Sequence, residues 1–252
     1  MYCIRFVIPY IIFVLSSALP ITSQAENGRM NSIVLAVEDS WPPYADANGQ
    51  GISTDILKQA FNSVGIKLIT RVYPYARVLD EVKKGTLVGG YNVTRQASTD
   101  KLYLFGQQAL LQAAASFYFS PENKAAQKYQ SIADIPAGTS VGIIIDYEYG
   151  DLFEQHKNRF KEVKVSSQEQ VINMLRLGRI DSAILFDAVA SHTLKTMELP
   201  EGSIQKGPLN HVSDIYVAFS RAHKQAQYFA DKLDQGLLMI KKNGQYDNLL
   251  QH

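Results

Sequence analysis

The chain has 252 residues, which is enough for one large domain or two of modest size. Hydrophobic residues make up 46% of it and charged residues 19%, values that are typical of a folded globular protein and exclude a low-complexity or disordered chain. The formal net charge of +1 argues against nucleic acid or an anionic membrane as the main partner.

The first 25 residues have the three parts of a secretory signal peptide. Arg5 provides a basic start, residues 6–15 form a short apolar centre, and Ser23-Gln24-Ala25 places small residues before a cleavage site. We therefore predict cleavage after Ala25 and secretion of the remaining chain.

An uncleaved membrane anchor is the alternative for this segment. The apolar centre is shorter than the ~20 residues that a membrane span needs, and it contains Pro9, so the signal peptide is favoured. Cys3 is the single cysteine of the chain and lies in the leader. The mature protein is therefore expected to need no disulfide and to offer no thiol chemistry.

Strands and helices alternate in the first half of the mature chain. A helix is predicted to be capped by Ser53-Thr54-Asp55, because apolar residues recur at helical spacing from Ile56 to Val64, and to stop at Gly65. The other predicted elements are a strand at 32–37, a strand at 67–73, a helix at 75–84 closed by Gly85, and a strand at 86–92. This βαβαβ order predicts a largely parallel sheet covered by helices.

The same alternation begins again further along the chain, after an apolar strand at 113–119 and a polar connection at 121–130. The predicted elements are a strand at 140–145, a helix at 148–157, a strand at 163–165, a helix at 167–177 ending at Gly178, a strand at 180–186 and a helix at 187–195. Two similar units in tandem predict an α/β protein of two lobes with a cleft between them.

The end of the chain adds a strand at 215–219, a helix at 224–242 and a final turn at 244–250. A lone strand and helix cannot bury their apolar faces, so we expect them to complete one of the lobes. If they pack on the first lobe, the chain crosses between the lobes twice and forms a two-stranded hinge. We predict a first lobe of residues 26–111 and 222–252 and a second lobe of residues 112–221.

Two carboxylates and two aromatic rings follow the first predicted strand, within residues 37–44. Pro42 and Pro43 lack a backbone N–H and hold φ near −65°, so they end the strand and place Trp41 on a stiff turn. Ligands of open α/β sheets bind beyond the carboxyl ends of the strands, which makes this turn a candidate ligand surface. The alternative is a tryptophan that covers the end of the core, with solvated acids beside it.

Four predicted strand ends carry polar or aromatic side chains suited to a small ligand, two from each lobe. They are Glu38 with Trp41, Tyr91 and Asn92 with Thr94, Asp146 with Tyr147 and Glu148, and Asp187. Each alone can be a helix cap or a solvated turn residue, and Asp187 is a clear cap candidate. The sequence shows no glycine-rich phosphate loop, no Gly-x-Ser-x-Gly elbow and no histidine pair at metal spacing. We therefore expect a ligand site without catalysis, metal or cofactor.

Taken in order, several segments resemble the bacterial extracellular solute-binding proteins of family 3, the periplasmic receptors of polar amino-acid ABC transporters. These segments are residues 33–44, 51–57, 90–94, 141–143, 177–181 and 242–246. The resemblance implies a two-lobed type II periplasmic binding fold and a monomer that captures a small solute, such as an amino acid, for an inner-membrane ABC permease. Two alternatives stay open: an enzyme, since the cyclohexadienyl dehydratases resemble this family too, and a ligand-sensing partner of a membrane receptor.

The resemblance also implies roles for individual residues. Trp41 falls where the family stacks an aromatic ring on the ligand, and Glu38 where an acid meets the ligand's ammonium group. Asp187 falls near a second-lobe acid with the same role, although it stands one residue farther from Asp181 than is usual. The full predicted site comprises Glu38, Trp41, Tyr44, Arg77, Gly90, Tyr91, Asn92, Thr94, Arg95, Tyr147, Glu148 and Asp187.

Two positions depart from the family pattern. Ala97 stands where the family has an arginine that clamps the ligand's carboxylate, with Arg95 two residues earlier and Arg77 as a candidate replacement. Asp146, Tyr147 and Glu148 stand at a helix start where many members have Gly-Thr-Thr or Gly-Tyr-Ser. Two carboxylates at a helix N-terminus would repel an anion, so we predict a preference for amine-bearing solutes.

Overall fold

The computed structural model describes residues 1–2 and 31–250. The predicted signal peptide, apart from its first two residues, and its cleavage site lie outside the described residues. No helix within this described part is both long enough and apolar enough to cross a membrane.

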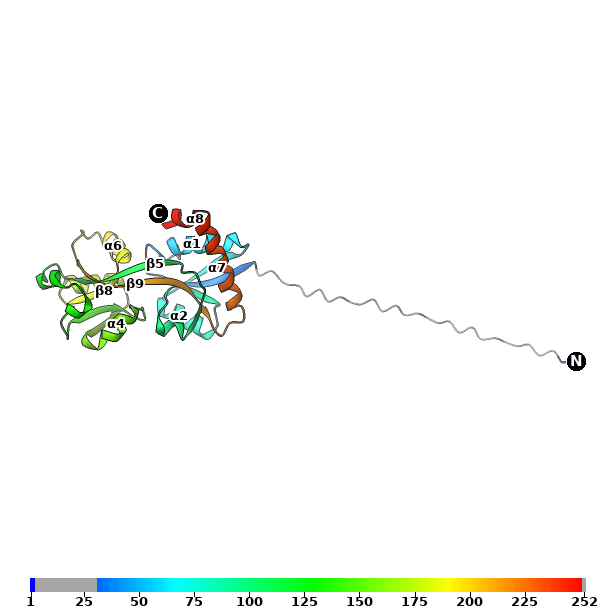
Figure 1. The fold of residues 1–252 in the computed structure, drawn as a ribbon, viewed down its shortest axis with the longest axis horizontal. Helices are drawn as coiled ribbons and strands as arrows, with labels where there is room; N and C mark the ends of the chain where they lie inside the picture. The colour runs from blue at the N-terminus through cyan, green and yellow to red at the C-terminus, as the bar shows by residue number, and fades with distance from the viewer. Residues whose placement is uncertain (3–30, 251–252) are drawn as a thin grey trace.

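The described chain forms one mixed sheet of nine strands with helices packed against it (Figure 1). The strands are β1 (Ser32–Glu38), β2 (Lys67–Tyr73), β3 (Gly89–Thr94), β4 (Tyr103–Phe105), β5 (Leu111–Phe119), β6 (Ser140–Ile144), β7 (Lys161–Val165), β8 (Ser182–Phe186) and β9 (Gln205–Ser220). Their order across the sheet is β2-β1-β3-β9-β5-β8-β6-β7, and β4 pairs with β9.

The helices connect these strands. They are α1 (Ile52–Ser63), α2 (Tyr75–Lys84), α3 (Ala97–Asp100), α4 (Gly150–His156), α5 (Gln168–Arg176), α6 (Asp187–Thr196), α7 (Ala226–Lys242) and α8 (Gln245–Leu250). Short 3-10 turns lie at Lys124–Lys128, Ile132–Asp134 and Lys157–Arg159. The first lobe holds β1, β2 and β3 with α1, α2, α7 and α8, and the second lobe holds β6, β7 and β8 with α4, α5 and α6 (Figure 1).

The strands β1, β2 and β3 of the first lobe pair in parallel, as do β6, β7 and β8 of the second. The two strands that cross between the lobes, β5 and β9, pair antiparallel with each other and with their neighbours. β1 pairs with β2 and β3, and β6 pairs with β7 and β8, all in parallel. β5 and β9 pair antiparallel along their length; β9 also pairs with β3, and β5 with β8. These two strands cross between the lobes as the two-stranded hinge expected from the sequence (Figure 1). The residue boundaries given above for the lobes stay a prediction.

The C-terminal helix completes the first lobe. Leu233, Leu237 and Ile240 of α7 share one buried apolar cluster with Phe61 of α1. At Gly236, a Cβ atom would lie 2.1 Å from the backbone carbonyl oxygen of Ala60, so only glycine allows the two helices to approach this closely. The trailing strand and helix therefore take the first of the two placements considered above.

Three expectations from the sequence need correction. Helix α1 begins at Ile52 with Gly51 as its N-cap, and no side chain caps it. Thr54, which was predicted to belong to the cap, lies buried within the first turn and hydrogen-bonds the carbonyl oxygen of Gly49 and the hydroxyl of Tyr91. The cap is therefore supplied by backbone geometry, and the threonine hydroxyl is used in a tertiary contact instead.

The second correction concerns two strands. The third strand was predicted at 86–92 but runs from Gly89 to Thr94, and β9 begins at Gln205 and not at residue 215. Gly207 and Pro208 made the first part of β9 look like a loop, although hydrogen bonding to β5 holds it in the sheet. The third correction is that α3 and β4 were not predicted, because elements of three or four residues show no sequence period.

Candidate functional site

Strand ends from both lobes meet at a small inner cavity of about 10 Å³. Its lining residues are Glu38, Trp41, Tyr75, Asn92, Thr94, Tyr147, Glu148 and Phe186. Glu38 ends β1, Thr94 ends β3 and Phe186 ends β8, while Tyr147 and Glu148 follow β6. The space is about that of one water molecule, so in this conformation the inner cavity is nearly filled by protein.

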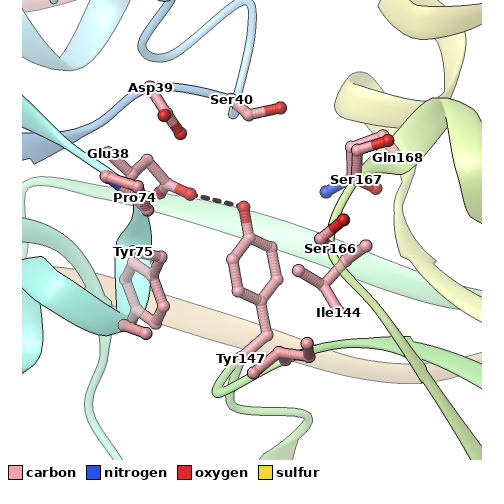
Figure 2. Close-up of a pocket in the computed structure, with 12 residues that line it drawn as sticks. Glu38, Asp39, Ser40, Pro74, Tyr75, Ile144, Tyr147, Ser166, Ser167 and Gln168 are labelled. Carbon is pink, nitrogen blue, oxygen red and sulfur yellow. Dashed lines mark hydrogen bonds between the residues drawn. The ribbon is translucent and has the colours of Figure 1, made fainter.

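A larger outer cavity of about 190 Å³ adjoins it (Figure 2). The residues lining the outer cavity are Glu38, Asp39, Ser40, Pro74, Tyr75, Ala76, Ile144, Ile145, Tyr147, Ser166, Ser167 and Gln168. Glu38, Tyr75 and Tyr147 line both cavities. Figure 2 shows the side chain of Tyr147 reaching across to Glu38, so that its ring lies between the walls of the cleft.

Two hydrogen-bonded pairs of a tyrosine and a glutamate connect the lobes. The Tyr147 hydroxyl donates to Oε2 of Glu38, and the Tyr75 hydroxyl donates to Oε2 of Glu148 at 2.6 Å. The two tyrosine rings contact each other edge to face, with their centroids 4.9 Å apart. Each lobe thus contributes one carboxyl group and one hydroxyl group to the contact.

Burial makes both carboxyl groups easier to protonate than in water. Desolvation raises the pKa of Glu38 well above its usual range, against the opposing hydrogen bond from Tyr147, and the charges of Glu148 and Asp39 raise it further. Desolvation raises the pKa of Glu148 to about 8, although hydrogen bonds from Tyr75 and from the backbone of Glu148 and Thr94 lower it. A cation entering the cleft would favour the ionised form of both groups.

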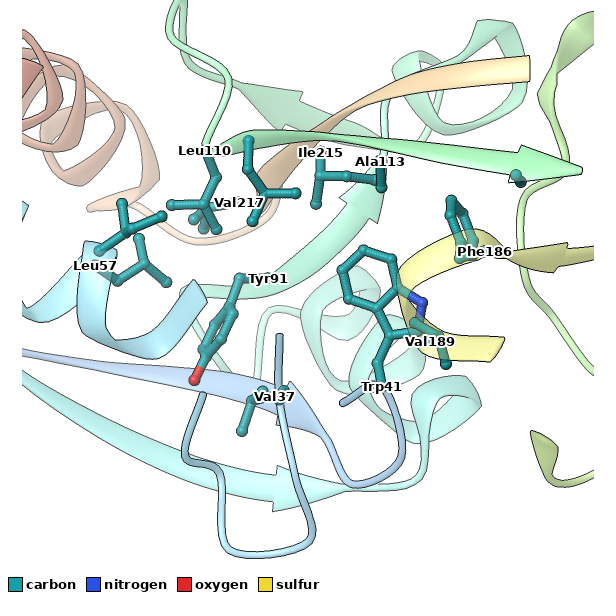
Figure 3. Packing of buried hydrophobic residues seen from close by; sticks show 14 of the residues in the cluster. Val37, Trp41, Leu57, Tyr91, Leu110, Ala113, Phe186, Val189, Ile215 and Val217 are labelled. Atoms are coloured by element: carbon teal, nitrogen blue, oxygen red, sulfur yellow. The ribbon is translucent and has the colours of Figure 1, made fainter. Parts of the chain in front are cut away.

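Trp41 belongs to the core and to the cavity wall. It is 1% exposed, its ring centroid lies 4.4 Å from that of Tyr44, and it meets the ring of Phe186 edge to face at 5.1 Å. Figure 3 shows the indole facing Phe186 and Val189 from the other lobe. The ring covers the core, as one of the two readings of the sequence expected, and it also lines the inner cavity, while its role as a ligand surface stays a prediction.

Asn92 brings an unsatisfied amide to the same cavity. The residue is 4% exposed, and neither Nδ2 nor Oδ1 has a hydrogen-bond partner within the described part of the chain. Its φ of 69° places it in the left-handed region, which asparagine tolerates better than most residues. A buried amide without partners costs free energy, so Asn92 offers both a donor and an acceptor to a ligand.

Comparison with known sequences decides the family. The sequence model of the bacterial extracellular solute-binding proteins, family 3, matches residues 33–252. The chain belongs to this family. No curated protein sequence matches the chain.

Solved structures agree with the fold that family 3 implies. A histidine kinase sensor domain with similarity to periplasmic binding proteins has a TM-score of 0.75 at 16% identity, covering 88% of this chain and 95% of that one. An ancestral arginine-binding protein bound to arginine has a TM-score of 0.72 at 19% identity, covering 88% and 97%. An amino-acid ABC transporter substrate-binding protein from Streptococcus pneumoniae, bound to L-arginine, has a TM-score of 0.71 at 16% identity, covering 88% and 93%. The predicted type II periplasmic binding fold is confirmed.

Six of the predicted site residues line the cavities of this family 3 protein: Glu38, Trp41, Asn92, Thr94, Tyr147 and Glu148. Tyr75 and Phe186 line them too but were missed. Tyr75 was predicted as the first residue of a helix, two residues before Arg77, and only the arginine was considered for the site. Phe186 was read as the apolar end of a strand, with no polar group to mark it.

Three uncharged predicted residues support the site from behind. Gly90 faces α2, where a Cβ atom would lie 2.5 Å from Cγ1 of Val78, so glycine is needed for helix packing. The Tyr91 hydroxyl hydrogen-bonds Thr54 in the buried core. Tyr44 packs against Trp41. None of the three is among the residues that line the two cavities.

The two arginines offered by the sequence in place of the family clamp have other partners. The guanidinium of Arg77 lies 4.6 Å from the ring centroid of Tyr73, and its Nε lies 3.5 Å from Glu81. Nε of Arg95 lies 2.9 Å from Oδ1 of Asp100. Neither arginine lines the cavities, and no Lys, Arg or His is among the lining residues that the structure describes.

Asp187 also points away from the two cavities. Its carboxylate accepts hydrogen bonds from the Tyr118 hydroxyl at 2.9 Å and from Nζ of Lys206 at 2.8 Å. It makes no capping bond to α6, whose N-cap is Phe186, so the reading of Asp187 as a helix cap is wrong. The carboxylate instead joins α6 to β5 and β9.

Proposed function

We propose that this protein is a periplasmic solute-binding protein that captures a small amine-bearing solute for an inner-membrane ABC permease. One observation carries the proposal: the buried carboxyl group of Glu38 and the half-buried carboxyl group of Glu148 face a cleft whose described lining has no positively charged side chain. An ammonium group supplies the charge that this cleft lacks. An anion would find no positive charge there and would oppose ionisation of both carboxyl groups.

The low dielectric of the cleft strengthens this selection. Charges interact more strongly where water is excluded, so the attraction of an ammonium group and the repulsion of an anion both increase. The rings of Trp41, Tyr75 and Phe186 add faces and edges that suit a cation or an aliphatic chain. The outer cavity is smaller than the ~300–1,000 Å³ typical of small-molecule sites, which favours a solute of few heavy atoms.

Export and partner follow from the sequence and the family. The signal-peptide pattern at residues 1–25 and membership of an extracellular solute-binding family support a periplasmic location. The arginine-bound neighbours share only the fold at 16–19% identity, so they support a binding role without naming the solute. We propose a monomer that binds its solute unchanged and hands it to the permease.

A thermal-shift screen tests the proposal. Purified mature protein is mixed with amino acids, polyamines, small peptides and simple dicarboxylates, and a ligand at ~100 times its dissociation constant should add roughly 2.7 kcal/mol of stability. We expect at least one amine-bearing compound to stabilise the protein and dicarboxylates to have no effect. Stabilisation by dicarboxylates alone would contradict the proposal.

The enzymatic alternative has its own assay. One solved neighbour is an ancestral amino-acid-binding protein described as a precursor of cyclohexadienyl dehydratase, with a TM-score of 0.70 at 15% identity over 88% of this chain and 94% of that one. Incubation with prephenate or arogenate should give no product. Turnover of either compound would replace the binding role by an enzymatic one.

A further inference from the structure

The carboxyl group of Glu148 lies against the hydrogen-bond donors of the inner cavity that could otherwise bind an anion. It accepts a hydrogen bond from the Tyr75 hydroxyl at 2.6 Å, and the backbone N–H groups of Thr94 and Glu148 lie close enough to lower its pKa by hydrogen bonding. Hydroxyl and backbone N–H donors of this kind are what a ligand carboxylate would need. In this structure the side chain of Glu148 already uses these donors.

No positively charged side chain on the described lining of the cleft can receive a carboxylate. Arg95 hydrogen-bonds Asp100 and the carbonyl oxygen of Gly106, and Arg77 lies over Tyr73. Apart from Glu38 and Glu148, the charged side chain on the described lining is Asp39, which is acidic as well. A ligand carboxylate would therefore meet no positive charge and would lie beside Glu38, Asp39 and Glu148, a placement that is unfavourable where water is excluded.

From this geometry we infer that the cleft selects primary amines that carry no carboxylate, and that it discriminates against the corresponding α-amino acids. The inference rests on the proposed function and narrows its ligand class. Glu148 plays the part of a carboxylate supplied by the protein, so the ligand needs only its ammonium end.

The placement of the amine follows from the groups that remain free to bind it. Glu38 lines both cavities, and its one hydrogen-bond donor among residues 1–2 and 31–250 is the Tyr147 hydroxyl, which an ammonium group can replace. Oδ1 of Asn92, on the inner cavity, is buried with no partner among the residues that the structure describes, and it provides a further acceptor. The carbon chain would then extend into the outer cavity, which is lined by Asp39 on the side of Glu38 and by Ile144 on the opposite side (Figure 2). This arrangement suits a linear diamine, whose second ammonium group meets Asp39.

Calorimetric titration of the mature protein with matched ligand pairs tests the inference. The pairs are cadaverine with L-lysine and agmatine with L-arginine, in which each amine is the amino acid without its carboxylate. We expect the amine of each pair to bind at least 10-fold tighter. Equal or tighter binding of the amino acids would overturn this inference while leaving the amine-bearing class of the proposed function intact. Failure of every amine and amino acid to bind would overturn the proposed function itself.

A charge-removing variant shows whether Glu148 is the cause. Glu148→Gln keeps the size of the side chain but removes the carboxyl group that can ionise beside a bound ammonium group, so the preference for cadaverine over L-lysine should fall several-fold. Glu154→Gln is the matched control, because Glu154 lies on α4, pairs with Lys157 and is exposed, and its variant should keep the full preference. An unchanged preference in a folded Glu148→Gln protein would overturn the assignment. The comparison of ligand pairs on the unmodified protein does not depend on this variant folding.

Discussion

The two tyrosine–glutamate pairs look alike but are not equivalent. Glu148 receives a hydroxyl from Tyr75 and support from backbone N–H groups, and it lines only the inner cavity. Within the described residues, Glu38 receives a hydrogen bond from the Tyr147 hydroxyl alone, and it lines both cavities. The comparison teaches that one carboxyl group is anchored by the fold, whereas the other is held by a single bond that a ligand can replace. Binding should therefore depend on Glu38, and selectivity on Glu148.

Replacing Glu38 should have the largest effect. Glu38→Gln keeps the shape but removes the charge that meets the ammonium group, so amine affinity should fall by about 2–4 kcal/mol, roughly 30-fold or more. Calorimetric titration with cadaverine measures the loss. Glu81→Gln is the matched control, since Glu81 lies near Arg77 on α2 and lines neither cavity. Equal affinities of the two variants would remove Glu38 from the binding site.

Removing the hydroxyl group of each tyrosine should distinguish the two pairs, because only one of the two variants should bind amines more tightly. Tyr147→Phe leaves Glu38 without its hydrogen bond and should lower the free energy of unfolding by about 1–3 kcal/mol, yet it should tighten amine binding because the competing hydroxyl is gone. Tyr75→Phe should also destabilise the protein but should not tighten binding. Urea unfolding and calorimetric titration measure both quantities. If both variants changed affinity in the same direction, the distinction between a replaceable and an anchored carboxyl group would fail.

Glu148 should give the unliganded protein a characteristic dependence on pH. Burial raises its pKa to about 8 in the folded protein from an ordinary value near 4.5, so the folded state holds the proton over this range while the unfolded state has lost it. Stability should therefore fall as pH rises from about 5 through 8, by at most ~1.4 kcal/mol per pH unit for this one group. The difference between the unmodified protein and Glu148→Gln in urea unfolding at several pH values isolates this contribution. A difference that is constant over the range would contradict the buried, protonated state of Glu148.

The smallest expected effect is a change in the fluorescence of Trp41. It is the single tryptophan of the chain and meets Phe186 of the other lobe edge to face, so separation of the lobes should expose the indole and shift its emission to longer wavelength. Tyr147→Phe, which removes one bond between the lobes, should show this shift without ligand, and cadaverine should reverse it. Identical spectra for the variant and the unmodified protein would mean that the Tyr147 bond does not hold the cleft in this form.

The sequence predicted the fold better than the site because the two depend on different information. Strand and helix periods, helix-stopping glycines and the order of motifs are local, and they predicted β2 and α2 correctly. The partner of a side chain is not local. Asp187 was predicted to meet the ligand. Its carboxylate instead binds Lys206, which lies nineteen residues further along the chain. Tyr75 gave no sign of meeting Glu148, which lies 73 residues further along the chain.

Three residues that line the inner cavity share one property. Glu38, Thr94 and Phe186 each end a strand, and the carboxyl ends of the parallel strands in both lobes point toward one cleft. Topology therefore located Glu38 and Thr94 without knowledge of any contact. The same rule would have found Phe186, had an apolar strand end been considered.

The hydrogen bond between Tyr147 and Glu38 has a consequence for rates. A solute can reach Glu38 only in the fraction of molecules in which this bond is broken, so the apparent dissociation constant equals the intrinsic one divided by that fraction. If one molecule in about a hundred is open, affinity is weakened about 100-fold, or roughly 2.7 kcal/mol. Association would then become independent of solute concentration once opening limits it. Tyr147 would then set the rate of binding, because the cleft stays closed until the hydrogen bond between Tyr147 and Glu38 breaks.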